Sequence, residues 1–200
     1  MVSVVRRSSE RPLEAFLIST GIVALAEMGD KTQLLALVLA ARFRRPVPII
    51  LGILVATLVN HAFAGALGAW ITSVISADVL RWILGLSFIA MAGWMLVPDK
   101  IEVDEHEKSR FGVFGATLIA FFLAEMGDKT QIATVALAAK YASFYWVVAG
   151  TTLGMMIANV PAVLVGDKAA GKLPLKLIHG IAAAIFAVLG VLAIVMRPSP

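Results

Sequence analysis

The stretch LAEMGDKTQ occupies residues 25–33, and residues 123–131 repeat it letter for letter. Both copies lie inside apolar sequence, where a charged residue costs free energy unless it is paired or has a function. An alignment at an offset of 98 residues extends the match beyond the motif, for example from Gly52 to Gly150. The chain is therefore an internal duplication, and this duplication decides its predicted organisation.

The composition is that of a membrane protein. Of the 200 residues, 60% are hydrophobic and 15% are charged, and the mean hydropathy is +0.92. A soluble domain has about 45–50% apolar and about 25% charged residues. Residues 47–77, 141–166 and 177–196 contain no Asp, Glu, Lys or Arg. Each of these stretches reaches the roughly 20 residues that a membrane-spanning helix needs, so we predict an integral protein of the lipid bilayer.

Each copy of the duplication is predicted to form three helices. Because three is an odd number, the second copy enters the membrane from the side opposite to the first. The predicted fold is therefore all-α, with six transmembrane helices as two inverted three-helix repeats. The predicted units are a polar N-terminus at 1–12, a first repeat at 13–98, a linker at 99–110 and a second repeat at 111–198. The helices are expected at residues 13–42, 47–73, 79–97, 111–141, 144–167 and 174–196.

The distribution of basic residues predicts an orientation. Nine of them fall on the side of the linker, namely Arg42, Arg44, Arg45, Lys100, Lys108, Arg110, Lys168, Lys172 and Lys176. Six fall on the other side, namely Arg6, Arg7, Arg11, Arg81, Lys140 and Arg197. Cytoplasmic loops carry an excess of Lys and Arg, so the linker is expected in the cytoplasm and both termini outside.

Composition also excludes several kinds of site. The chain has no cysteine, so it offers no disulfide, thiolate metal site or cysteine nucleophile. Its net charge of +4 comes from basic residues beside membrane segments, without a basic patch interleaved with aromatic residues. Nucleic acid is therefore not an expected partner. Whether the chain forms a homo-oligomer is left open.

The segment that carries each motif is too long for a straight membrane span. Residues 15–41 make 27 residues, about 40 Å of helix, whereas the hydrocarbon core is roughly 30 Å thick. The helix must therefore tilt or break, and Gly29 and Gly127 are the expected hinges. A break would free backbone carbonyls to act as ligands, as in the discontinuous helices of transporters.

Four carboxylates of the two motifs are the predicted metal ligands: Glu27, Asp30, Glu125 and Asp128. Carboxylate oxygens suit hard divalent cations, which take six to eight oxygen ligands for Ca²⁺ and an octahedral set for Mn²⁺ or Mg²⁺. One motif alone cannot fill such a shell. Two motifs related by a pseudo-two-fold axis can fill it if their carboxylates converge.

The charges of the motifs suggest a mechanism. Together with Lys31 and Lys129, the four carboxylates carry a net charge of two negative, which is costly in a low dielectric. One divalent cation or two protons neutralise this charge, so the lysines would provide charge balance and the carrier would exchange one ion for two protons. The alternative reading treats Glu27–Lys31 and Glu125–Lys129 as intrahelical pairs that only staple helices together.

Other polar residues are weaker candidates. Gln33, Gln131, His61, Asn60 and Asn159 are candidates for metal ligation or proton relay. A lone membrane histidine is also a common helix-packing residue, so this reading of His61 stays open. Thr32 and Thr130 are the weakest polar candidates, because a helical threonine often bonds only to its own backbone.

The sequences Glu27–Thr32 and Glu125–Thr130 both match the pattern E-x-G-D-[KR]-[TS]. Two such motifs, each opening a three-helix half, resemble the Golgi and bacterial cation/proton exchanger family known as uncharacterised protein family 0016, in the lysine-exporter superfamily. The resemblance covers essentially the whole chain. It implies a secondary transporter of Mn²⁺, or next of Ca²⁺, which exports Mn²⁺ from the cytoplasm across the plasma (inner) membrane by proton antiport. No prosthetic group is implied.

Three other functions compete with this prediction. A cation channel or uniporter can use the same acidic groups. An intramembrane aspartyl protease needs two aspartates that share a proton, but here each Asp accompanies a Glu and a Lys. A structural assembly factor leaves four buried carboxylates without a purpose. The charge balance and the repeats favour a transporter over an enzyme.

Overall fold

A computed structural model gives the fold of the chain. It describes residues 2–94, 96, 112–165 and 175–195. Within these residues the chain forms helices and no strand, which confirms the all-α prediction. The predicted linker, residues 99–110, lies outside the described residues.

Eight helices follow one another along the described chain. They are α1 (Val2–Glu27), α2 (Lys31–Phe43), α3 (Pro46–Val74), α4 (Ala77–Trp94), α5 (Gly112–Glu125), α6 (Lys129–Tyr141), α7 (Phe144–Val165) and α8 (Leu175–Val195). The first helix begins at Val2 and continues through Pro12, whereas the sequence predicted a start at residue 13. Pro46 opens α3, a position where the missing N–H of proline costs nothing.

The two segments that carry the motif are each split into two helices. Helix α1 ends at Glu27 and α5 ends at Glu125, and the next helix begins four residues later in both cases. At each break a glycine has a positive φ, 81° at Gly29 and 78° at Gly127, a conformation that glycine adopts without steric cost. The bend between α1 and α2 is 69°. Each motif therefore lies at a junction of half-helices rather than on a continuous helix.

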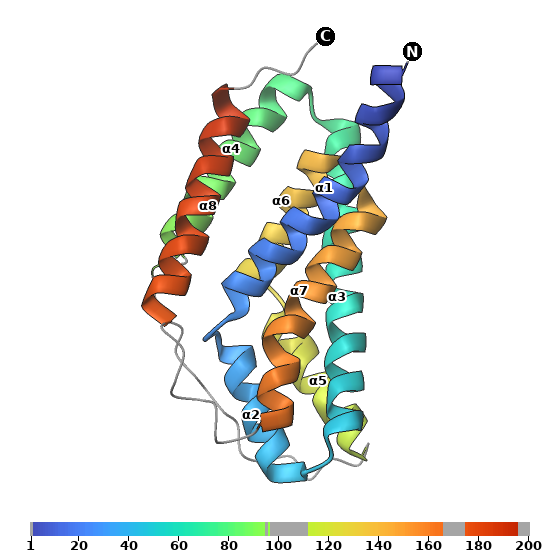
Figure 1. The fold of residues 1–200 in the computed structure, drawn as a ribbon, viewed down its shortest axis with the longest axis vertical. Coiled ribbons are helices and arrows are strands. Elements are labelled where there is room, and N and C mark those ends of the chain that lie inside the picture. The colour runs from blue at the N-terminus through green and yellow to red at the C-terminus, as the bar shows by residue number, and fades with distance from the viewer. Residues whose placement is uncertain (1, 95, 97–111, 166–174, 196–200) are drawn as a thin grey trace.

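The helices of one half pack mainly against helices of the other half. Helix α1 lies along α7, α3 lies along α5, α6 and α7, and α4 pairs with α8 (Figure 1). Glycines allow the closest approaches. A Cβ atom on Gly52 would lie 2.9 Å from the carbonyl oxygen of Phe114, and one on Gly150 would lie 2.5 Å from that of Phe16. Both members of the second contact are displaced by 98 residues from those of the first, so the same contact is made twice with the halves exchanged.

The start of α1 and the end of α8 lie at the same end of the bundle, and the α2–α3 connection lies at the opposite end (Figure 1). By length and composition, α3 and α7 can each cross a membrane, and α1 with α2 makes a third span if the bent pair counts as one. Six spans therefore remain a prediction.

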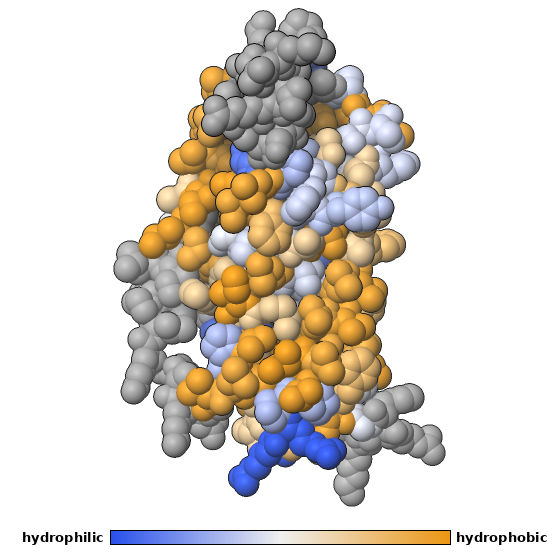
Figure 2. All heavy atoms as spheres, turned by 45° about the vertical axis from the view of Figure 1, so that its right-hand side comes forward, coloured by the Kyte–Doolittle hydropathy of each residue, from blue (hydrophilic) through white to orange (hydrophobic). Residues whose placement is uncertain are grey.

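The surface of the bundle is largely apolar. Figure 2 shows apolar residues along most of one face, and a hydrophilic group at the end where α2 connects to α3. Arg42, Arg44 and Arg45 are the exposed basic residues of that connection. Large apolar side chains are strongly exposed elsewhere, for example Phe63 at 73%. An apolar surface of this extent is unusual for a soluble monomer and fits contact with lipid.

Candidate cation-binding site

The two helix breaks bring both motifs into the interior of the bundle. The side chains of Glu27 and Glu125 are fully buried, and Asp30 and Asp128 are only 2% and 4% exposed. Buried charges are costly unless they are paired, hydrogen-bonded or bound to a metal. The contacts of these four carboxylates therefore define what the site can do.

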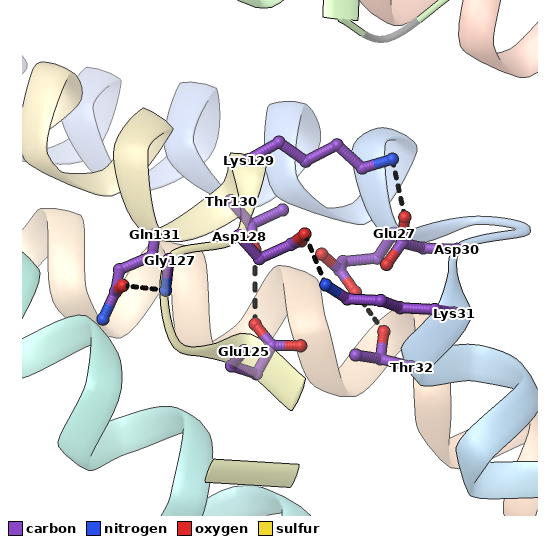
Figure 3. A network of polar contacts seen from close by, with 10 residues as sticks. All are labelled: Glu27, Asp30, Lys31, Thr32, Glu125, Gly127, Asp128, Lys129, Thr130 and Gln131. Carbon is purple, nitrogen blue, oxygen red and sulfur yellow. Dashed lines mark hydrogen bonds and ion pairs between the residues drawn. The ribbon is translucent and has the colours of Figure 1, made fainter. Parts of the chain in front are cut away.

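The two aspartates pair with lysines of the opposite motif. Lys129 Nζ lies 2.6 Å from Asp30 Oδ1, and Lys31 Nζ lies 2.8 Å from Asp128 Oδ1 (Figure 3). Both aspartates occupy N-cap positions, of α2 and α6, yet neither side chain makes the usual cap hydrogen bond to the backbone. These ion pairs run between the motifs, whereas the alternative reading of the sequence expected them within one helix.

The two threonines orient the two glutamates. Thr32 Oγ1 donates a hydrogen bond of 2.6 Å to Glu27 Oε2, and Thr130 Oγ1 donates one of 3.3 Å to Glu125 Oε2. The expectation that these hydroxyls bond only to their own helix backbone is therefore wrong. In the part of the chain that the structure describes, the other oxygen of each glutamate, Oε1, has no hydrogen-bond partner.

Three of the four carboxylates form a compact group. Glu27, Asp30 and Asp128 each offer one oxygen, and these oxygens lie within 4.8 Å of one another. Oxygens on opposite sides of a hard cation, each at about 2.3–2.6 Å, are separated by about 5 Å, so the spread fits a single ion. Glu125 is not a member of this group. We name Glu27, Asp30 and Asp128 the carboxylate group.

The two glutamines hold the backbone at the breaks. Gln33 Oε1 accepts the N–H of Gly29 at 2.9 Å, and Gln131 Oε1 accepts the N–H of Gly127 at 2.7 Å. Gln33 Nε2 also donates to the carbonyl oxygen of Ala158 in α7, at 3.0 Å. Because these bonds satisfy N–H groups that the break leaves outside a helix, the glutamines stabilise the shape of the site.

The polar residues of α3 and α7 differ in their contacts. Asn60 Nδ2 donates a hydrogen bond of 3.1 Å to the carbonyl oxygen of Phe122, which lies in the last turn of α5. Asn159 Nδ2 bonds to the carbonyl of Met155 in its own helix, also at 3.1 Å. His61 is fully buried, and neither ring nitrogen has a partner among the described residues. It is not a member of the carboxylate group.

Two contacts to backbone carbonyls were not predicted from the sequence. They are the bonds to Ala158 and to Phe122, which fix the motif regions to α7 and α3. Pro161 does not signal the first contact, because the carbonyl that loses its N–H partner is that of residue 157 and not that of Ala158. The second contact follows from the end of α5 at the motif. In the sequence, only the expected break at Gly127 and the presence of Asn60 in an apolar helix could have indicated this contact.

The two lysines differ in their exposure although their motifs are identical. The side chain of Lys129 is completely buried, whereas that of Lys31 is 31% exposed. An ammonium group inside a membrane protein faces a protein partner or water rather than lipid. Lys31 therefore lies nearer to the surface of the bundle than Lys129 does.

The arrangement suits reversible binding of a hard cation. It presents carboxylate oxygens, which such cations prefer, and the chain has no cysteine that could supply a thiolate. The ligands come from the two halves of the chain, so a relative movement of the halves changes the site. Such a site can bind and release an ion without covalent chemistry.

Comparison with known proteins gives a family. The chain matches the model of the family described as "Divalent cation/proton antiporter GDT1" over residues 15–103 and 113–199. It is 53% identical over 179 residues to a Vibrio cholerae serotype O1 protein named "Putative manganese exporter", and this alignment covers 89% of each chain. No solved structure matches the chain.

More distant relatives carry the same family name. The chain is 31% identical over 186 residues to "GDT1-like protein 4" of Oryza sativa subsp. indica, which covers 80% of this chain and 66% of the relative. It is 31% identical over 198 residues to "GDT1-like protein sll0615" of Synechocystis sp., which covers 88% of this chain and 96% of the relative. The two segments matched by the family model each contain one motif. The chain belongs to the GDT1 family of divalent cation/proton antiporters, and it is a transporter rather than an enzyme.

Proposed function

We propose that this protein exports Mn²⁺ from the cytoplasm across the plasma membrane in exchange for protons, with Ca²⁺ as the next preferred ion. The observation that carries the proposal is the carboxylate group, in which three buried carboxylates from both motifs lie within 4.8 Å of one another. The family and a relative named for manganese export support the choice of substrate.

The charges of the site support a fixed stoichiometry. Four buried carboxylates and the two motif lysines carry a net charge of two negative. One divalent cation neutralises this charge, and so do two protons. A carrier whose halves rearrange only when the site is neutral exchanges one cation for two protons, because a net charge in the membrane interior is costly.

The two halves of the chain act as inverted repeats in this proposal. Two matching sets of contacts support it: each motif lysine reaches the aspartate of the other motif, and the contact of Gly52 with α5 recurs as that of Gly150 with α1. Inverted repeats place a substrate site between them near the bilayer midplane. Movement of the two halves, with six spans in all, opens this site to one side of the membrane and then to the other. The central linker lies in the cytoplasm and both termini lie outside.

The residues of the site take different roles. Glu27, Asp30 and Asp128 bind the ion in the arrangement described here, and Glu125 joins the shell when the halves rearrange. Gln33, Gln131 and Asn60 keep the half-helices in place through their backbone hydrogen bonds. The glycines of the two motifs provide the hinges. His61 and Asn159 are retained as candidates for proton movement, because each has a buried polar atom without a partner among the described residues.

Metal-driven proton flux in liposomes tests the proposal. Purified protein is reconstituted with a pH-sensitive dye inside, and Mn²⁺, Ca²⁺ and Mg²⁺ are added outside in turn. We expect proton movement opposite to metal movement, largest with Mn²⁺, and its loss in the Glu27→Gln/Glu125→Gln double variant.

A matched control is Asp78→Asn in α4. Its carboxylate is 82% exposed and pairs only with Arg81 among the described residues, so we expect flux equal to that of the parent protein. Metal entry without proton movement would contradict antiport and point to a channel or uniporter. Proton flux that persists in the double variant would exclude the glutamates from the exchange.

A further inference from the structure

The identical motifs are used unequally in this structure. Glu27, from the first motif, belongs to the carboxylate group, whereas its counterpart Glu125 does not. Lys129 lies in the closed interior, whereas its counterpart Lys31 is 31% exposed. The motifs themselves are identical, so these differences come from their surroundings, namely the residues that differ between the halves and the way in which the halves are arranged.

The partly exposed lysine, Lys31, forms an ion pair with Asp128, which is a proposed ligand of the ion. Lys31 Nζ contacts Asp128 Oδ1 at 2.8 Å, while Asp128 Oδ2 is buried without a hydrogen-bond partner among the described residues. Asp128 is a member of the carboxylate group, so an ammonium and an incoming cation compete for the same carboxylate. Lys31 is the better placed of the two motif lysines to move away from the group, because its side chain is 31% exposed, whereas that of Lys129, beside Asp30, is fully buried.

Electrostatic repulsion favours movement of the Lys31 ammonium away from a bound ion. A divalent cation held by Asp128 would lie a few ångströms from Lys31 Nζ. Repulsion between the cation and an ammonium at this distance is large in a low dielectric, and it falls as the lysine side chain turns toward its exposed side. The lysine does not have to leave the site altogether, so four carboxylates, two lysines and one divalent cation together stay neutral.

We propose that Lys31 is a tethered cation that holds Asp128 in the empty site and is displaced toward its exposed side when the divalent ion binds, while Lys129 stays in place as the permanent counter-charge of Asp30. This inference rests on the proposed function. It assigns the two lysines, identical in their motifs, to different roles: Lys31 sets the affinity through competition, and Lys129 positions a ligand.

Chemical labelling of the two amines tests the displacement. The purified protein is treated with formaldehyde and a borane reductant, with and without Mn²⁺, and the methylation of each lysine is quantified by mass spectrometry. The bound Mn²⁺ is measured in the same samples. We expect Mn²⁺ to raise the labelling rate of Lys31 severalfold and to leave that of Lys129 unchanged. Bound Mn²⁺ with unchanged or reduced labelling of Lys31 would overturn the proposal.

Two substitutions separate competition from charge balance. Lys31→Arg keeps the charge but can grip Asp128 with two hydrogen bonds, so we expect the Kd for Mn²⁺ to rise on the order of tenfold. Lys31→Gln removes the competitor, so we expect the Kd to fall while turnover is reduced. If Lys31→Arg binds Mn²⁺ like the parent protein, the lysine only balances charge and the competition is refuted. If the parent protein itself binds no Mn²⁺, the proposed function fails instead.

Discussion

The hydroxyl of Thr32 bonds to one oxygen of Glu27 and leaves the other oxygen of that carboxylate without a partner among the described residues. A carboxylate held in this way is pre-oriented, which reduces the entropy lost when an ion binds. The corresponding bond from Thr130 to Glu125 is longer, at 3.3 Å, and Glu125 lies outside the carboxylate group. Two identical motifs thus offer an internal comparison of one interaction.

Replacing Thr32 by valine keeps the shape of the side chain and removes this hydrogen bond. Because ordering one released side chain on binding costs about 0.5–1.5 kcal/mol, we expect the Kd for Mn²⁺ to rise about two- to tenfold. Thr130→Val serves as the control and should change the Kd much less. Isothermal titration of both variants with Mn²⁺ gives the answer, and equal effects would contradict the different roles of the two glutamates.

His61 presents a different question at the same scale. Its imidazole is buried, but it is not a member of the carboxylate group, so we do not expect it to bind the ion in this arrangement. The variant His61→Asn copies the residue at the equivalent position, Asn159, and should leave the Kd for Mn²⁺ within about twofold, since imidazole is not an oxygen ligand of the preferred kind. A rise beyond tenfold in equilibrium dialysis would place His61 in the ion shell. A loss of flux at constant Kd would assign it to proton movement.

At the scale of helices, the break at each motif places the carboxylates of a membrane-spanning segment in the candidate cation-binding site. The glycines at the breaks, Gly29 and Gly127, have φ of 81° and 78°, and α2 is bent by 69° from the direction of α1. The breaks also place the N-terminal ends of α2 and α6 in the interior, where the partial positive charge of a helix end stabilises the carboxylates of Asp30 and Asp128.

Gly127→Ala tests the need for glycine at a break. A Cβ atom there would meet nothing within 4 Å, so any cost comes from the backbone conformation alone, at about 1–3 kcal/mol. We expect a lower midpoint of thermal unfolding and a weaker Mn²⁺ affinity. The control is Gly21→Ala in α1, where a Cβ atom also meets nothing but φ is not positive. A Gly127→Ala variant as stable as this control would show that the break tolerates alanine.

The sequence predicted the helices better than the contacts between them. Apolar runs and prolines located the long helices, and the excess length of the segment at 15–41 predicted a tilt or a break, with Gly29 and Gly127 as the hinges. It could not predict that Lys31 pairs with Asp128, because that contact depends on how the two halves dock. It could not predict that Glu125 lies outside the carboxylate group either, because identical motifs carry no information about an asymmetric conformation.

At the scale of the whole molecule, the proposed exchange of one divalent ion for two protons moves no net charge. We therefore expect the rate of Mn²⁺-driven proton flux to be independent of the membrane potential. Liposomes clamped with valinomycin and a potassium gradient measure this directly, because the free energy of moving one charge changes by about 2.3 kcal/mol per 100 mV. A steep dependence on voltage would exclude the stoichiometry of one ion to two protons, although not transport itself.

The central claim is that one ion is shared by two motifs, and the number of Mn²⁺ ions bound per chain tests it most directly. Equilibrium dialysis is carried out on the parent protein and on the Glu27→Gln and Asp128→Asn variants, one substitution in each motif. Thermal unfolding confirms that each variant is folded. We predict one Mn²⁺ per chain in the parent protein and loss of that ion in both variants. Two ions per chain, with one retained in each variant, would contradict the shared site and show that each motif binds its own ion.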